Sequence, residues 1–295
     1  MFSAPFELPS RTLHSGQKEL KLDTPRLMGI LNSTPDSFSD GSSFYKFDAA
    51  LAQARKMITD GADWLDIGGE SSGPESTDVS LDEELQRVVP LIQTIRAESD
   101  IWISVDTWKA EVARQSLEAG ADAVNDVTAL RGDAEMAKVI AGYQVPVILM
   151  FSKDSSARTT RVQSDYEDVL DTLKSFFRER LEFAESNGIH KSQIVLDPGM
   201  GLFISGKAKY SFEVIRSISE LHEFDLPLLL GPSRKSFLAE VSPGRSLNFS
   251  ERDIPCVAVS SIALWQGVSI IRFHEVEQGR LLIDTIKALK SGAAI

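Results

Sequence analysis

Eight short apolar runs recur along the chain, and a segment with helical spacing follows each of them. Short apolar runs bounded by polar residues are typical of buried strands, and strands that alternate with helices pair in parallel. Eight such units predict an α/β fold, a single closed (β/α)8 TIM barrel. The runs occupy residues 27–31, 64–67, 101–105, 123–124, 145–150, 194–196, 226–230 and 268–271.

The segments between the runs carry signals for helix ends. Ser80 followed by Glu83 indicates a capping box, and Gly120 and Gly188 stand where helices would end. The predicted helices span residues 47–61, 81–98, 109–119, 133–142, 165–187, 209–222, 251–267 and 276–291. An open doubly wound sheet is the alternative, and the lack of a dinucleotide fingerprint after the first run favours the barrel.

An N-terminal extension precedes the first run. Residues 11–13 and 19–22 flank a Ser-Gly-Gln turn, which predicts a hairpin that closes the bottom of the barrel. No linker separates one part of the chain from another, so residues 1–295 are predicted to form one domain. The three long loops, 32–46, 68–80 and 151–164, are expected on the catalytic face.

Composition excludes several classes of partner and site. A net charge of -12 argues against binding to nucleic acids or anionic membranes, which need a basic surface. Cys256 is the only cysteine, so an intrachain disulfide is impossible. Neither a signal peptide nor an apolar run long enough to span a bilayer is present, and we expect a cytoplasmic protein.

Polar residues end several of the apolar runs. Asp106, Asn125 and Asp197 close the third, fourth and sixth runs, and Lys235 follows the seventh. Each of them alone is consistent with a structural cap, but the carboxyl ends of barrel strands converge on one pocket. Two carboxylates, an amide and an ammonium group suit a flat heterocycle that carries N–H donors and a carbonyl group.

A second group of residues suits an anion and its counterion. Arg272 and His274 alternate around Phe273 after the last run, so their side chains face the same way and can clamp an oxyanion. Asn32 opens the first loop, where an amide oxygen can bind Mg²⁺, although one amide is weak evidence for a metal. Neither zinc-ligand spacing nor a catalytic Ser-His-Asp arrangement is evident.

These motifs resemble the dihydropteroate synthases over nearly the whole chain. The most specific segments are Met28-Gly-Ile-Leu-Asn-Ser-Thr-Pro-Asp-Ser-Phe-Ser-Asp-Gly41 and Ser233-Arg-Lys-Ser-Phe237. The other matching segments, in family order, are residues 66–71, 103–107, 125–127, 197–201 and 272–274. The resemblance implies a transferase of folate biosynthesis, which joins 6-hydroxymethyl-7,8-dihydropterin diphosphate to p-aminobenzoate and releases diphosphate.

The resemblance also implies a role for individual residues. Asp106, Asp197, Lys235 and Arg272 would be catalytic, and Met150 and Ile271 would pack near the pterin. The pterin site would consist of Asp106, Asn125, Asp197 and Lys235. The diphosphate site would consist of Asn32, Ser72, Arg272 and His274, with Mg²⁺ on Asn32. The p-aminobenzoate site would consist of Phe38, Asp40, Ser72, Pro74, Leu202, Lys235 and Ser236. A homodimer would form through late helices that carry Ile262, Leu264 and Trp265.

The chain departs from the family pattern in two loops. The second loop reads Glu70-Ser-Ser-Gly-Pro74 and lacks an anion-binding Arg, while the sixth reads Asp197-Pro-Gly-Met-Gly-Leu-Phe-Ile204 and lacks a Lys. Basic residues that could stand in for the two missing cations are Lys153, Arg158, Arg161, Lys207 and Lys209. The sixth loop is similar to that of the sulfonamide-resistance synthases, which predicts reduced sulfonamide sensitivity.

Two other functions remain alternatives. The missing cations are also consistent with a catalytically weak paralogue that binds pterin without forming dihydropteroate. A pterin-dependent methyltransferase domain would use the same kind of barrel, but the intact segment 233–237 argues against it.

Overall fold

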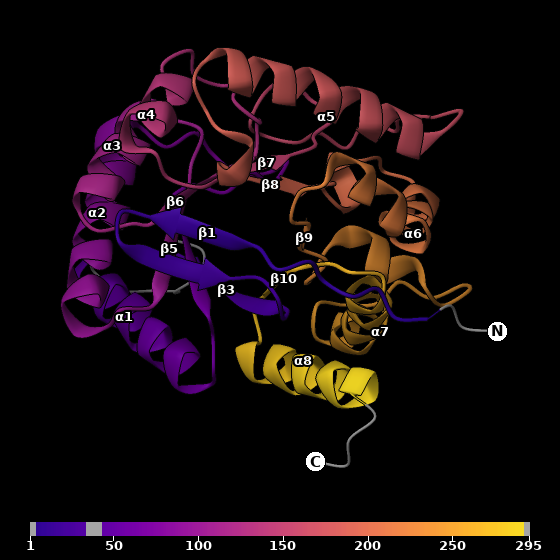
Figure 1. Cartoon of the computed structure of the whole chain (residues 1–295). Helices are drawn as coiled ribbons and strands as arrows, with labels where there is room; N and C mark the ends of the chain where they lie inside the picture. Colours follow the sequence, from indigo (N-terminus) through magenta and orange to yellow (C-terminus); the bar gives the residue numbers. More distant parts are fainter. Residues whose placement is uncertain (1–3, 34–42, 292–295) are drawn as a thin grey trace.

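Eight parallel strands form a ring that helices surround (Figure 1). The computed structural model describes residues 4–33 and 43–291. The order of the strands in the sheet is β8-β7-β6-β5-β4-β3-β10-β9, and a parallel bridge between Leu196 and Leu228 joins the two ends of the sheet. The barrel is therefore confirmed and the open sheet is excluded. The strands are β3 (Arg26–Asn32), β4 (Trp64–Gly68), β5 (Trp102–Asp106), β6 (Ala123–Asp126), β7 (Val147–Met150), β8 (Ile194–Asp197), β9 (Leu229–Leu230) and β10 (Ile270–Phe273).

The helices lie close to their predicted positions, except that the helix predicted over residues 209–222 ends at Arg216 and is followed by a 3-10 helix, Ile218–Phe224. They are α1 (Ser43–Thr59), α2 (Leu81–Glu98), α3 (Ala110–Glu118), α4 (Met136–Tyr143), α5 (Val169–Ser186), α6 (Ala208–Arg216), α7 (Asp253–Trp265) and α8 (Val276–Ser291). Ser80 Oγ accepts from the Glu83 amide at 3.2 Å, whereas the Glu83 carboxylate pairs with Arg87, so half of the capping box forms. Gly120 and Gly188 take φ angles of +111° and +86° just after α3 and α5, as caps that favour glycine.

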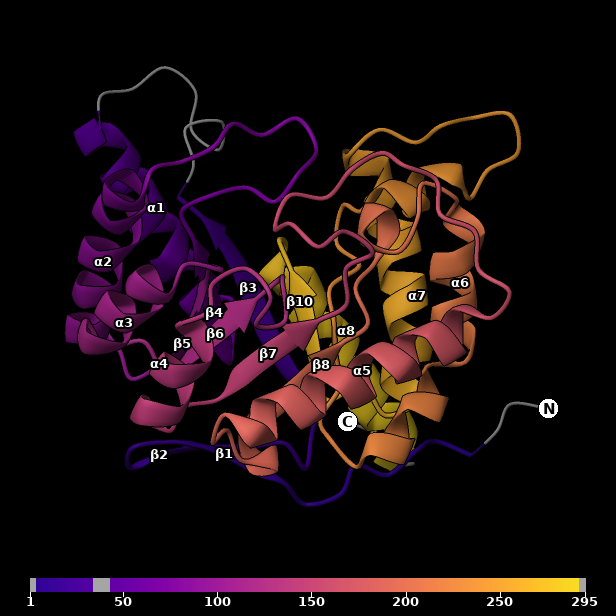
Figure 2. The ribbon, with the colours of Figure 1, turned by 90° about the horizontal axis from the view of Figure 1, so that it is seen from above.

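The N-terminal hairpin fills the lower end of the barrel, as predicted. It consists of β1 (Thr12–Ser15) and β2 (Lys18–Lys21), and Figure 2 shows it beneath the strands, opposite the long loops. Leu13, Leu20 and Leu22 pack against one inward-facing residue from each strand of the barrel. These eight residues are Met28, Trp64, Trp102, Ala123, Ile148, Val195, Leu229 and Ile270.

The polar site lies one step above this apolar layer. Side chains alternate along a strand, so the residue two positions further on points to the same side. Moving up two residues in each strand gives Ile30, Asp66, Ser104, Asn125, Met150, Asp197, Gly231 and Arg272. Residues of the opposite parity, such as Leu27, Ile103 and Ile271, belong to the larger core between strands and helices. The barrel therefore has an apolar floor and a polar upper layer.

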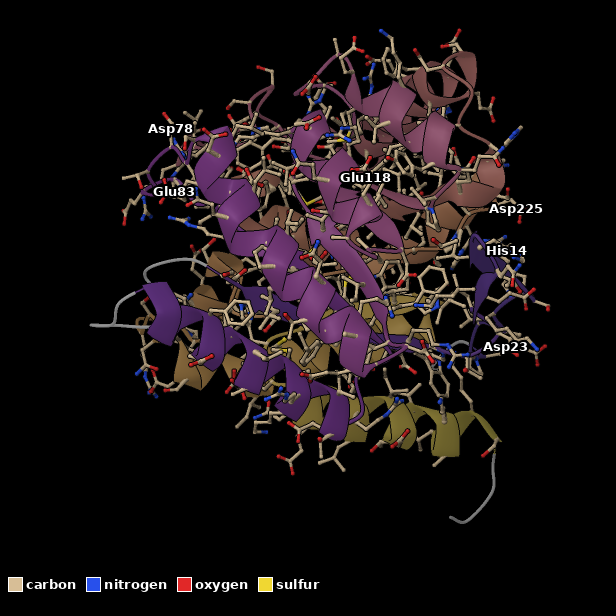
Figure 3. All side chains as sticks on the ribbon, turned by 90° about the vertical axis from the view of Figure 1, so that its left-hand side faces the viewer. His14, Asp23, Asp78, Glu83, Glu118 and Asp225 are labelled. Carbon is tan, nitrogen blue, oxygen red and sulfur yellow. The ribbon has the colours of Figure 1, made fainter. Side chains whose placement is uncertain are left out.

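Acidic side chains are prominent on the surface. Figure 3 shows Asp78, Glu83, Glu118 and Asp225 at the periphery of the molecule, in keeping with its net charge of -12. Within the ranges that the structure covers, no helix has both the length and the hydrophobicity that crossing a membrane requires. Cys256 is buried in α7, and burial raises the pKa of its thiol to about 12, which suits a structural role.

Candidate active site

One pocket at the carboxyl ends of the strands gathers several of the predicted residues, Ser72 and Arg272 among them. The four predicted ring ligands, Asp106, Asn125, Asp197 and Lys235, line it together. Its other lining residues are Ser72, Val127, Met150, Met200, Phe203, Gly231 and Arg272. Ile271 does not reach the pocket, contrary to the expectation for this residue, because its position in β10 turns its side chain outward into the core.

Asp66 is the centre of a buried hydrogen-bond network beneath the pocket. Its Oδ2 accepts from Arg272 Nε at 2.6 Å and from Asn125 Nδ2 at 2.9 Å, and its Oδ1 accepts from Ser104 Oγ at 2.5 Å. Arg272 Nη2 also donates to Asp106 Oδ2 at 2.8 Å. Sequence reasoning missed Asp66 as a site residue, although its place two residues after buried Trp64 was a usable signal.

Burial shifts the pKa values of Asp106, Asp197 and Lys235 toward neutrality. Desolvation, with a contribution from the Asp66 charge, raises the pKa of Asp106 to about 7, while Arg272 and Lys235 oppose this rise. Desolvation also raises the pKa of Asp197 to about 6, against the hydrogen bond from the Gly199 amide. The pKa of Lys235 falls to about 8 through burial and the charge of Arg272.

A strained turn directs Lys235 into the barrel. Arg234, which precedes it, has a φ of +60°, in the region that glycine favours. Two contacts hold this turn: Arg234 Nη2 pairs with Glu275 at 2.5 Å, and Arg252 Nη1 donates to the Arg234 carbonyl at 3.0 Å. The Lys235 ammonium consequently lies 4.4 Å from the centre of the Phe203 ring.

The sixth loop places Phe203 in the pocket rather than Leu202, which was the expected p-aminobenzoate ligand. The two residues belong to a 3-10 helix, Gly201–Phe203, whose successive side chains point in different directions. The Phe203 ring lines the pocket, whereas the Leu202 carbonyl accepts from Thr159 Oγ1 at 3.0 Å. Ser236 lies beside this loop, since a Cβ on Gly201 would be 3.1 Å from its hydroxyl oxygen.

His274 sits just outside the pocket lining as a neutral side chain. Burial and the nearby positive charges lower its pKa to about 3. Ser233 Oγ accepts from the His274 backbone amide at 3.3 Å and lies 2.9 Å from Nδ1. These two contacts hold the neutral imidazole beside the pocket.

Asn32 is next to the pocket at the end of β3. It pairs in register with Gly68, which in turn pairs with Asp106. One strand, β4, therefore separates Asn32 from the Asp106 carboxylate that Arg272 holds. Among the residues with a described structure, no three His, Cys, Asp or Glu side chains are grouped so that they could hold a metal ion.

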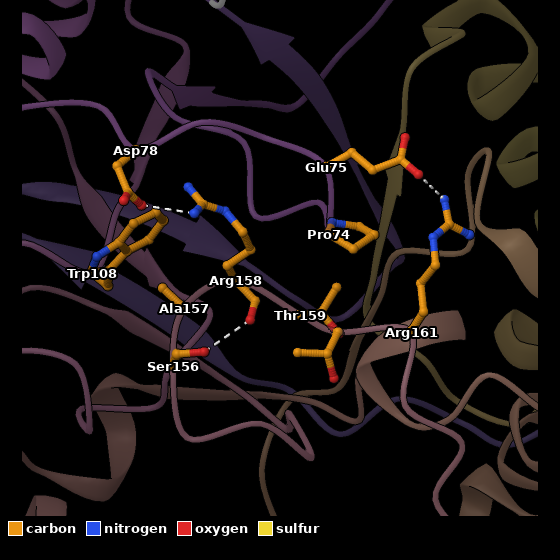
Figure 4. A pocket seen from close by; sticks show the side chains of 10 residues that line it. Pro74, Glu75, Asp78, Trp108, Ser156, Ala157, Arg158, Thr159 and Arg161 are labelled. Atoms are coloured by element: carbon orange, nitrogen blue, oxygen red, sulfur yellow. Dashed lines mark hydrogen bonds and ion pairs between the residues drawn. The ribbon is translucent and has the colours of Figure 1, made fainter.

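The second and fifth loops are joined to each other above the pocket. Ser72 lines the pocket, and its carbonyl accepts from the Thr159 amide at 3.0 Å. Pro74, expected at the p-aminobenzoate site, instead lines a separate cavity between the two loops (Figure 4). In that cavity Arg158 pairs with Asp78 at 2.7 Å, and Arg161 pairs with Glu75 at 2.6 Å (Figure 4).

The basic residues considered as substitutes for the two missing cations are occupied elsewhere. Arg158 and Arg161 pair as described above, and Lys207 Nζ is 2.6 Å from Asp165. Lys153 pairs with Asp154, and Lys209 lies over the Tyr210 ring. None of the five lines the pocket, whose cations within the described part of the chain are Lys235 and Arg272. Phe38 and Asp40 of the first loop lie outside the described residues.

Comparison with known proteins places this arrangement in a family. A family model described as pterin binding enzyme matches residues 28–274. The chain is 41% identical over 251 residues to a dihydropteroate synthase of Synechocystis sp., with 85% of each chain covered.

Solved structures agree with this result. One is a Xanthomonas albilineans dihydropteroate synthase with 4-aminobenzoic acid, at a TM-score of 0.87 and 36% identity, covering 97% of this chain and 100% of that one. Another is the enzyme from Xanthomonas albilineans in complex with 7,8-dihydropteroate, at a TM-score of 0.84 and 35% identity, covering 95% of this chain and 99% of that one.

Proposed function

Because this chain belongs to the dihydropteroate synthases, within the pterin-binding enzymes, we propose that its polar pocket holds the pterin ring of the diphosphate substrate. The family reaction joins 6-hydroxymethyl-7,8-dihydropterin diphosphate to p-aminobenzoate. The observation that carries the proposal is that Asp106, Asn125, Asp197 and Lys235 line one pocket. Their carboxylate and amide oxygens accept from ring N–H and amino groups, and Lys235 donates to ring acceptors.

The proposed chemistry breaks the bond between the pterin methylene and the diphosphate oxygen. The bonding electrons leave with diphosphate, and positive charge develops on the pterin, which Asp106 and Asp197 favour. Arg272 and the neutral imidazole of His274 bind the leaving group. The lone pair of the p-aminobenzoate nitrogen forms the new C–N bond, and its proton passes to water. A neutral amine needs no strong base.

Mg²⁺ is part of the proposal as a companion of the diphosphate. The carboxylates of Asp66 and Asp106 are engaged by Arg272, so the described residues offer the amide oxygen of Asn32 as the free ligand at this edge. Mg²⁺ readily keeps water and phosphate oxygens as its remaining ligands, and one amide fits that coordination. Bound there, Mg²⁺ would neutralise charge on the leaving diphosphate.

Reduced sulfonamide sensitivity is proposed on the shape of the second-substrate region. The Phe203 ring stands against Lys235 and lines the pocket, next to Ser72 of a second loop that has no arginine. A sulfonamide is larger than p-aminobenzoate beyond the group that replaces the carboxylate. A bulky ring at this place therefore excludes the drug more strongly than the substrate.

A homodimer is proposed on the exposed apolar side chains of the last two helices. Ile254 and Ile262 of α7 are 82% and 49% exposed, and Leu281 and Leu289 of α8 are 64% and 61% exposed. Leu264, also expected there, is buried and belongs to the core. We expect sedimentation to show a dimer that an Ile262→Glu, Leu281→Glu double variant converts to a monomer, and an unchanged mass would refute this interface.

Diphosphate release tests the proposed function directly. Purified protein is supplied with the pterin diphosphate and Mg²⁺, with and without p-aminobenzoate, and compared with an Asp197→Ala variant. We expect release that depends on p-aminobenzoate and is lost in the variant. Release that is indifferent to p-aminobenzoate, or none, would favour a pterin-binding paralogue that has lost the condensation.

A further inference from the structure

The hydrogen bonds around Asp66 have fixed directions. Trp64 Nε1 donates to Ser104 Oγ at 2.9 Å, and an indole nitrogen can only donate. Asp66 forms an ion pair with Arg272, and an ionised carboxylate oxygen only accepts, so the Ser104 hydroxyl donates to Asp66 Oδ1, 2.5 Å away. Arg272, which also can only donate, reaches Oδ2 at 2.6 Å. Asp66 is consequently an acceptor on both of its oxygens.

This arrangement determines which end of the Asn125 amide enters the pocket. The two ends of an amide are often hard to distinguish, but only the nitrogen end can face an acceptor. Asn125 Nδ2 lies 2.9 Å from Asp66 Oδ2. Its other end, Oδ1, is buried and has no hydrogen-bond partner among the described residues, although the residue lines the pocket.

We infer that Asp66 is a positioning residue, which makes Asn125 present a hydrogen-bond acceptor, and not a donor, to the bound ring. The inference rests on the proposed pterin pocket and adds a reason for its selectivity. A pterin offers an amino group and ring N–H groups to such an acceptor. A ring with an oxo group in place of the amino group would leave buried oxygens facing one another without a hydrogen.

Substitution of Asp66 by Asn provides the test, because an amide at this position can donate to Asn125 Oδ1. Asn125 is then free to turn its own nitrogen into the pocket. The probes are 6-hydroxymethylpterin and its 2-oxo counterpart, a lumazine. Neither carries diphosphate, so effects on the leaving-group contacts of Arg272 do not enter.

The measurement is the ratio of the two dissociation constants by calorimetry. We expect the wild-type protein to bind 6-hydroxymethylpterin more tightly than the lumazine. In the Asp66→Asn variant this preference should fall roughly tenfold, about the effect of one hydrogen bond. A variant that binds both rings more weakly by the same factor would overturn the inference, since a merely structural role predicts that result.

Asp63→Asn is the matched control. Asp63 precedes the same strand at the opposite end of the barrel, where it accepts from the Leu27 amide at 2.8 Å and pairs with Arg280. The Asp63→Asn variant shows how much the loss of any ion-paired carboxylate from the barrel weakens the binding of both rings. The preference ratio should remain that of the wild-type protein.

A second variant covers the case in which Asp66→Asn does not fold. The double variant Asp66→Asn, Asn125→Asp exchanges the carboxylate and the amide and keeps the net charge. The carboxylate moved to position 125 would then be the acceptor in the pocket, so we expect the amino preference to stay within about threefold of wild type. Loss of the preference in the exchange variant would overturn the inference. Because no turnover is involved, the result is independent of whether dihydropteroate forms.

Discussion

The Lys235 ammonium lies 4.4 Å from the centre of the Phe203 ring, so a residue of the sixth loop shapes the pocket around a residue of the seventh. A cation over an aromatic ring gains about 0.5–2 kcal/mol, which holds the ring in place. Phe203 thus occupies space beside the group on which both substrates are proposed to depend.

Replacement of Phe203 by Leu should increase sulfonamide sensitivity, because it removes the ring that narrows the second-substrate region. We expect the ratio of the sulfamethoxazole Ki to the KM for p-aminobenzoate to fall roughly tenfold, a change of about 1.4 kcal/mol. Phe212→Leu is the control, since Phe212 packs against Phe237, with ring centres 5.2 Å apart. A wild-type Ki far below the KM would contradict the proposed resistance.

The pH dependence of kcat/KM for the pterin diphosphate should be bell-shaped. Ionisation of Asp197 and Asp106, with pKa values of about 6 and about 7, supplies acceptors as the pH rises. Loss of the Lys235 proton, with a pKa of about 8, removes a donor above that pH. His274→Gln should lower the rate without moving either limb, because His274 is neutral over this range. A limb that disappears in His274→Gln would assign that titration to the histidine instead.

The stability of the fold should depend more on the positive charge at position 272 than on the shape of the guanidinium group. Arg272→Ala leaves the carboxylates of Asp66 and Asp106 without their ion-pair partner, and we expect about 3–5 kcal/mol lower stability in urea denaturation. Arg272→Lys keeps the charge but loses the planar fork, so it should fold. Its kcat/KM for the pterin diphosphate should fall at least tenfold, with the KM for p-aminobenzoate unchanged. Equal stability of the Ala and Lys variants would show that the charge network contributes little.

The fifth loop should influence the second substrate through Ser72. Arg158 Nε donates to Ser76 Oγ at 2.9 Å and Nη1 pairs with Asp78, so this side chain ties the fifth loop to the second. Arg158→Ala should raise the KM for p-aminobenzoate several-fold and leave the affinity for 6-hydroxymethylpterin unchanged. Arg161→Ala, which removes an exposed pair with Glu75, is the control and should behave like wild type. Identical effects of the two variants would argue against a specific link.

The barrel and its strand-end residues were predictable because they follow from periodicity. Asp106, Asn125 and Asp197 each end a strand, and parallel strands bring their ends together. Asp66 was not predicted as a site residue because it lies within its strand rather than at the end. The same alternation that places Trp64 inside the barrel also places Asp66 there, so parity was the missing criterion.

The loops were less predictable, since no periodicity governs them. Leu202 and Phe203 are adjacent and both apolar, and only the 3-10 turn determines which of them faces Lys235. The same holds for the basic residues of the fifth loop. Arg158 is a plausible anion ligand by residue type, but it forms ion pairs with Asp78 and Glu70 because of the way the fifth loop packs against the second.

The hairpin beneath the barrel has a consequence for the order of events during turnover. Leu13, Leu20 and Leu22 block one end, so every molecule enters and leaves through the other. In the proposed arrangement, p-aminobenzoate lies between the pterin ring at Asp197 and the open end of the barrel. The pterin substrate must therefore bind before p-aminobenzoate does, and it can leave only when the path to the open end is clear. Steady-state kinetics should therefore follow a compulsory order, with the pterin substrate first.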